Sequence, residues 1–94
     1  MAGPSLKGKS VLAITRDIAE GFFFLNPIVL KGFDTDGLKE LYYNMVKVQT
    51  EIRAEKFPSA DSDAIRRRNI KLQRLHNSIF ILKSFAKERR IIIY

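Results

Sequence analysis

Residues that could do chemistry are few in this sequence. His76 is the only histidine and there is no cysteine, so neither a thiol nucleophile paired with a histidine nor a zinc finger can be built. Two acidic pairs, Asp34 with Asp36 and Asp61 with Asp63, each precede an expected helix, where carboxylates accept backbone N–H groups and complement the helix dipole. No phosphate-binding loop or dinucleotide fingerprint is present. We therefore expect no enzyme activity, no metal, no cofactor and no small-molecule substrate.

The basic residues are concentrated in the last third of the chain. Residues 64–94 carry nine Lys or Arg and one acid, a net charge of +8, whereas residues 1–63 carry eight bases and nine acids, a net charge of −1. Five of these cations would lie on or beside one helix face: Arg66, Arg67, Arg68, Lys71 and Arg74. Such a face can bind DNA or RNA, or an acidic protein surface. Equally, it can be a solvated face whose counterparts are the chain's own acids, such as Glu40, Glu51 and Glu55.

The composition is that of one folded domain. The chain has 94 residues, of which 46% are hydrophobic and 29% charged, so it has apolar surface to bury. Its longest apolar run, Phe22–Leu30, is much shorter than the roughly 20 residues that span a bilayer, and it contains Asn26 and Pro27. The first residues resemble neither a secretory signal nor a transit peptide. We therefore expect residues 1–94 to form a single helical domain without a membrane segment, in the cytosol or nucleus.

Three helices are predicted by apolar residues that recur every three or four positions, over residues 9–20, 36–56 and 62–90. Ser10 can cap the start of the first helix, and Gly21 can end it in a left-handed conformation. Two long helices joined by a short break are antiparallel neighbours. The predicted fold is therefore an all-α antiparallel bundle. Its expected central residues are Leu38, Leu41, Met45, Val48, Ile52, Leu72, Leu75, Ile79 and Leu82.

The ends of the two long helices are also marked in the sequence. Asp36 is the expected cap of the second helix, and Asp61 or Ser62 that of the third. Phe57–Ser59 contains a proline and is expected to end the second helix and separate it from the third.

The connection between the first two helices, residues 22–32, is unusually apolar for a loop. Pro27 pushes Asn26 into an extended conformation, so two short extended pieces around a turn are expected. Because side chains alternate in an extended chain, at least one of the three consecutive phenylalanines should point away from the core. The connection then either folds back over the helices or is buried by another chain.

The apolar side chains outside the helical seams exceed what one small core can absorb. The last four residues, Ile91–Tyr94, are expected to form a short extended tail, either as a strand or as the opening of another buried element. We therefore predict an obligate hetero-oligomer with other protein subunits. The predicted partner-binding residues are Phe22, Phe23, Phe24, Ile28, Leu30, Phe80, Phe85, Ile91 and Ile93.

Three segments carry a family resemblance: GKSVLAITR at 8–16, LKELYYNMVKVQTEI at 38–52 and AIRRRNIKLQRLHNSIFILKSFAKERR at 64–90. Together they resemble the N-terminal helical domain of the first Psf-type subunit of the GINS complex. The first segment looks like that subunit's opening helix, and the last looks like its basic helix. The family continues into further helices and a small β domain, so we expect these residues to be the N-terminal part of a longer chain.

The resemblance implies a nuclear, non-catalytic structural subunit of a DNA-replication assembly. Such a subunit packs against the other three GINS subunits and supports the MCM helicase. Two alternatives from the residues stay open. One is a basic helical protein that binds nucleic acid or belongs to a ribonucleoprotein. The other is a small stand-alone bundle that binds peptides.

Overall fold

The computed structural model describes residues 5–6, 9–55 and 61–93. Four helices account for most of them: α1 (Val11–Glu20), α2 (Pro27–Leu30), α3 (Thr35–Ala54) and α4 (Ser62–Glu88). Two very short strands, β1 (Ser5–Leu6) and β2 (Lys9–Ser10), pair antiparallel ahead of α1. The three predicted helices are therefore confirmed, each to within about two residues of its expected ends.

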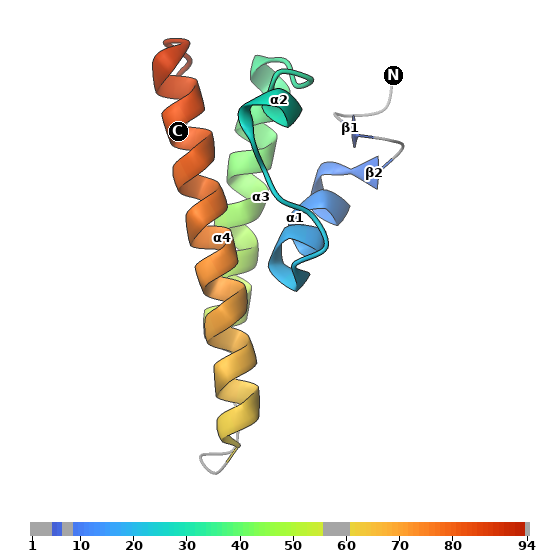
Figure 1. Cartoon of the computed structure of the whole chain (residues 1–94), viewed down its shortest axis with the longest axis vertical. Coiled ribbons are helices and arrows are strands. Elements are labelled where there is room, and N and C mark those ends of the chain that lie inside the picture. Colours follow the sequence, from blue (N-terminus) through green and yellow to red (C-terminus); the bar gives the residue numbers. More distant parts are fainter. Residues whose placement is uncertain (1–4, 7–8, 56–60, 94) are drawn as a thin grey trace.

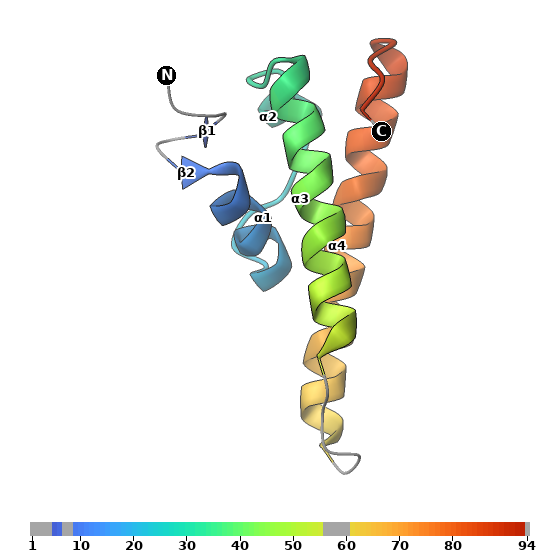
Figure 2. The same ribbon diagram turned by 180° about the vertical axis from the view of Figure 1, so that it is seen from behind.

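The helices α3 and α4 lie side by side in opposite directions, and α1 packs against both (Figure 1). Figure 2 shows from behind that the first turns of α4 extend past the last turn of α3. The molecule is elongated, with extents of 45 × 27 × 20 Å. The predicted all-α antiparallel bundle is confirmed.

The core lies between the three long helices and follows the predicted seams. Seven of the nine expected central residues are buried, and Leu72 and Ile79 pack against them half-buried. In α1, Val11, Ile14 and Ile18, which recur at three and four positions, are buried as well. The core is completed by residues that belong to no predicted seam, notably Leu25, Leu30 and Ile93.

The ends of α1 agree with the sequence. The backbone N–H of Ala13 donates to Ser10 Oγ at 3.2 Å, which makes Ser10 the N-cap. Gly21 follows the helix at φ +84°, in the left-handed region. Its N–H donates to the Ile18 carbonyl, and the N–H of Phe22 donates to the Asp17 carbonyl, so two otherwise unpaired carbonyls are satisfied.

The expected cap of α3 is wrong by two residues. Asp34, and not Asp36, is the N-cap: its Oδ1 accepts the backbone N–H of Gly37 at 2.7 Å. Asp36 lies in the first turn, where its charge still complements the helix dipole. The cap of α4 is Asp61, whose Oδ1 accepts the N–H of Ala64 at 2.9 Å. The predicted break at Phe57–Ser59 lies outside the described residues.

The connection between α1 and α3 differs from the expected pair of extended pieces. Asn26 is extended, as predicted, but it caps the one-turn helix α2: its Oδ1 accepts the N–H of Val29 at 2.9 Å. Pro27 occupies the first helical position, where a missing N–H and a fixed φ are favourable. The predicted alternation is confirmed, since Phe22 and Phe24 are exposed while Phe23 packs on the core.

The tail after α4 turns back against the bundle. Arg90 adopts φ +58°, the N–H of Ile91 donates to the Ala86 carbonyl at 2.8 Å, and the N–H of Arg90 donates to the Lys87 carbonyl at 3.1 Å. Ile93 is buried and Ile92 exposed, and residues 91–93 form no strand. The tail is therefore part of this chain's own core, while Tyr94 lies outside the described residues.

Candidate protein-interaction surface

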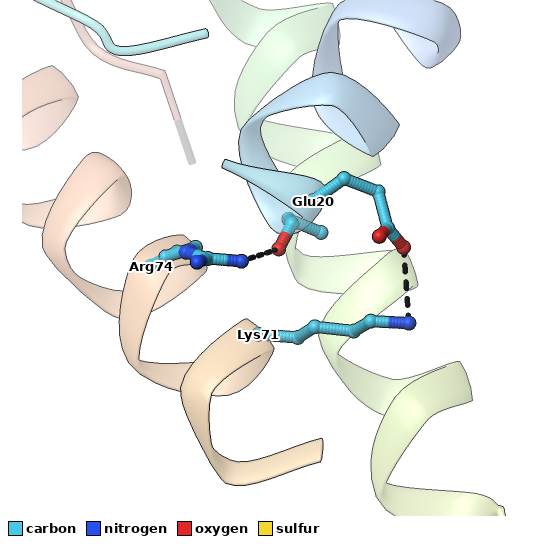
Figure 3. A network of polar contacts seen from close by, with 4 residues as sticks. Glu20, Lys71 and Arg74 are labelled. Atoms are coloured by element: carbon cyan, nitrogen blue, oxygen red, sulfur yellow. Dashed lines mark hydrogen bonds and ion pairs between the residues drawn. The ribbon is translucent and has the colours of Figure 1, made fainter. Parts of the chain in front are cut away.

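The predicted basic face is divided by the fold. Arg66 and Arg67, near the start of α4, are exposed, and Arg68 is half-buried. Lys71 and Arg74 instead turn toward the C-terminal end of α1 (Figure 3). Part of the basic face thus holds two helices together.

The contacts at this junction have a clear electrostatic cause. Arg74 Nη1 donates to the carbonyl oxygen of Ala19 at 3.0 Å, and Lys71 Nζ lies 3.0 Å from Glu20 Oε1. The last turn of α1, which the structure describes in full, contains no basic residue of its own. Its carbonyls form the negative end of the helix dipole, so two cations from α4 complement it.

Part of the basic face does pair with groups of this chain, but the acids differ from the expected ones. The counterparts of Lys71 and Arg74 are Glu20 and a backbone carbonyl of α1, and the described contacts do not pair them with Glu40, Glu51 or Glu55. Glu51 faces Arg16 at 3.9 Å instead, in an exposed contact of α3 with α1. If the whole predicted face bound phosphates, the contacts of Lys71 and Arg74 with α1 would have to break.

The other polar candidates form no site. His76 is exposed and lines a shallow groove between α3 and α4 with Tyr42 and Arg53. Within residues 5–6, 9–55 and 61–93, no group of three His, Cys, Asp or Glu side chains could hold a metal ion. In those same ranges, no helix has the length and apolar character that crossing a membrane requires.

The predicted partner-binding residues separate into a buried and an exposed set. Leu30, Phe85 and Ile93 lie in the chain's own core, and Phe23 and Ile91 are half-buried against it. Leu30 and Ile93 are buried because α2 and the tail pack against the core, whereas Phe85 lies on the core-facing side of α4. We therefore remove the three buried residues from the candidate surface.

Among the residues that the structure describes, five large apolar side chains are at least 67% exposed, and we call them the apolar surface. Their exposed fractions are 78% for Phe22, 71% for Phe24, 81% for Ile28, 67% for Phe80 and 77% for Ile92. Phe80 lines two neighbouring grooves. It lines one groove with Leu25–Pro27, on the connection before α2, and another with Ile91 and Ile92 of the tail.

Ile92 was not among the predicted partner-binding residues, and the positions of Lys83, Lys87 and Arg90 in the groove were not predicted either. The helical part of the groove could have been predicted from the sequence. Phe80, Lys83 and Lys87 are spaced by three and four residues and must share one face of a helix. The position of the tail beside them depends on the backbone reversal at Arg90, which the sequence does not mark with a glycine.

No protein-family model, no curated protein and no solved structure matches this chain.

Proposed function

We propose that this chain is a non-catalytic subunit of a multi-protein assembly. The observation that carries the proposal is the apolar surface, whose five side chains remain at least 67% exposed after the chain has folded. Burying a phenylalanine or isoleucine side chain contributes about 1.5–3 kcal/mol. An assembly that covers these five residues gains that free energy, whereas an isolated chain leaves them in water.

The shape of the molecule supports the same proposal. The chain exposes 6545 Å² of surface. A compact monomer of its mass, 10.8 kDa, would expose about 5500 Å². Its radius of gyration is 14.1 Å, against about 12.4 Å for a compact domain of this length. Extended surface of this kind is typical of subunits that are completed by neighbours.

We further propose that the assembly is GINS-like and acts in the nucleus, in support of the MCM helicase during DNA replication. This finer proposal rests on the resemblance of residues 8–16, 38–52 and 64–90 to the first Psf-type subunit. The structure is compatible with it in element order: a short helix, an apolar connection and two long antiparallel helices.

The nucleic-acid alternative has less support in the contacts. Lys71 and Arg74, two of the five cations on which it rests, are engaged by α1. The remaining exposed pair, Arg66 and Arg67, would neutralise few phosphates, and affinity for nucleic acid grows with the number neutralised.

The experiment is affinity purification of the tagged chain from its own cells, with quantitative mass spectrometry of the proteins that co-purify. We expect GINS-like subunits at stoichiometric amounts. A double variant of the apolar surface, F22S/F24S, should retain less than about a fifth of them, because it removes about 3–6 kcal/mol of burial.

The matched control is K39S/K47S, which truncates two exposed polar side chains of α3 to the same residue. It should retain its partners. Recovery of the chain alone would contradict an assembly role, and recovery with ribosomal proteins would contradict the replication assignment.

A further inference from the structure

The C-terminal end of α4 and the tail form an open groove of about 790 Å³. Its apolar lining includes Phe80 from α4 and Ile91 and Ile92 from the tail. Phe80 and Ile92 are both more than two-thirds exposed, so the groove is open to a large partner. A groove of this size and apolar character can take side chains from another protein.

The charged residues of the groove all have one sign. Lys83, Lys87 and Arg90 line it, and none of the described residues that line it is acidic. Glu88, the one acid of α4's last turn, lines the neighbouring groove beside Leu25–Pro27. The side chains that line the groove therefore carry a net positive charge, which carboxylates of a partner would complement.

The backbone of Arg90 adds a second observation. Arg90 has φ +58°, a left-handed conformation that is unfavourable for a residue with a side chain and that glycine adopts freely. At the end of α1 the same pattern of backbone hydrogen bonds is closed by Gly21. The chain thus places a cation at a position where glycine would fit better, at the edge of an apolar groove. A strained residue at such a position points to a function of its side chain.

We propose that this groove binds an acidic amphipathic helix of a partner protein. This inference rests on the proposed assembly function, since it states which kind of partner segment the chain receives. The apolar side chains of that helix pack over Phe80 and Ile92, and its carboxylates face Lys87 and Arg90.

A helix suits the groove better than an extended peptide. Phe80, Lys83 and Lys87 are spaced three and four residues apart and follow one face of α4 over about 10 Å, or two turns. A partner helix lying along this face presents its own side chains at the same spacing, as in helix-in-groove recognition. Nucleic acid is a poorer match, because Phe80 is the one aromatic side chain among the described residues that line the groove, whereas single strands stack successive bases on several aromatic faces.

The test places a photo-crosslinker in the groove of the tagged chain in its own cells. Ser84 lines the groove and is exposed, so it is replaced by p-benzoylphenylalanine. After illumination, the attached molecule is identified by mass spectrometry. We expect a protein segment with an excess of acids and with apolar residues every three or four positions. The same crosslinker at Thr50, an exposed residue of α3 outside the groove, should not capture that segment.

Charge variants then test whether the cations of the groove bind the carboxylates of the partner. K87Q/R90Q should lower the yield of the Ser84 adduct at least about fivefold, because carboxylates of the partner lose their counter-charges. The matched control R66Q/R67Q removes the same charge from exposed residues at the other end of α4. It should leave the yield within about twofold of the unchanged chain.

Several outcomes would overturn the inference: an adduct with nucleic acid or lipid, an adduct with a basic or neutral segment, or equal losses in the two charge variants. If partners co-purify but position 84 captures nothing, the groove inference fails and the assembly proposal stands. If nothing co-purifies with the unchanged chain, the assembly proposal itself fails.

Discussion

The guanidinium of Arg74 lies directly against the backbone of Gly21. A Cβ at position 21 would lie 2.8 Å from Arg74 Cζ, closer than side-chain carbons approach in proteins. From this position Arg74 Nη1 reaches the carbonyl oxygen of Ala19 at 3.0 Å. Glycine is thus favoured at position 21 by its left-handed φ of +84°, and an added Cβ would also force the end of the Arg74 side chain to shift.

The first prediction concerns Gly21→Ala. The left-handed conformation should cost alanine about 1 kcal/mol, and displacing Arg74 should weaken a hydrogen bond of about 1 kcal/mol. We therefore expect the free energy of unfolding, measured by urea denaturation, to fall by about 2 kcal/mol. Gly32→Ala is the control, because Gly32 has no left-handed φ and its added Cβ would lie 3.3 Å from the Val29 carbonyl oxygen. Equal losses in the two variants would refute the role of Arg74's close approach.

The second prediction separates the two cations that α4 offers to α1. Arg74→Met removes a charged donor from a partly buried hydrogen bond and should lower the free energy of unfolding by about 1–2 kcal/mol. Lys71→Met breaks an ion pair whose side chains are 35% and 48% exposed, so solvent screening should limit its loss to about 0.5 kcal/mol. Urea denaturation of both variants measures the difference. A larger loss for Lys71→Met would show that charge alone, and not the hydrogen bond, joins these helices.

The third prediction concerns the strained backbone of Arg90. Arg90→Gly and Arg90→Ala both remove the cation, but only glycine relieves the left-handed conformation. We expect the free energy of unfolding of the glycine variant to be about 1 kcal/mol higher than that of the alanine variant. Both variants should lower the adduct yield at position 84, because that effect depends on charge. Equal stabilities would mean that the conformation at residue 90 is not strained.

The fourth prediction compares an exposed and a buried apolar residue of α4. Leu75 is fully buried, so Leu75→Ala should destabilise the isolated chain by about 2–5 kcal/mol. Phe80→Ser should change its stability by about 0.5 kcal/mol or less, since the side chain is 67% exposed. The same Phe80→Ser chain should nevertheless lose its partner at the groove. A strong destabilisation by Phe80→Ser would place Phe80 in the core rather than on the apolar surface.

Most of the fold was predictable, because helical periodicity and caps are local signals. Ser10, Gly21 and Asp61 marked helix ends correctly, and the seams of α3 and α4 named the core. The cap of α3 was assigned to the wrong acid because Asp34 and Asp36 carry the same chemistry two residues apart. The helix α2 was missed because Pro27 was read as a breaker, although a proline preceded by asparagine also suits the first helical position.

The surface was less predictable, because exposure depends on contacts between distant segments. Arg67, Lys71 and Arg74 share one helix face by their spacing, but only the position of α1 determines which of them are engaged. Leu30 and Ile93 looked like partner-binding residues because each lies in an apolar connection or tail. Ile93 is buried by the backbone reversal at Arg90 and Leu30 by the packing of α2 against α4, and apolar content alone reveals neither.

The central claim is that another chain covers the apolar surface. Hydroxyl-radical footprinting measures this directly, because it reports the solvent accessibility of phenylalanine and isoleucine side chains. The tagged chain isolated with its partners should be oxidised at Phe22, Phe24 and Phe80 at least about fivefold more slowly than the refolded chain alone, since burial excludes the solvent-borne radical. Equal oxidation rates in the two samples would contradict the account.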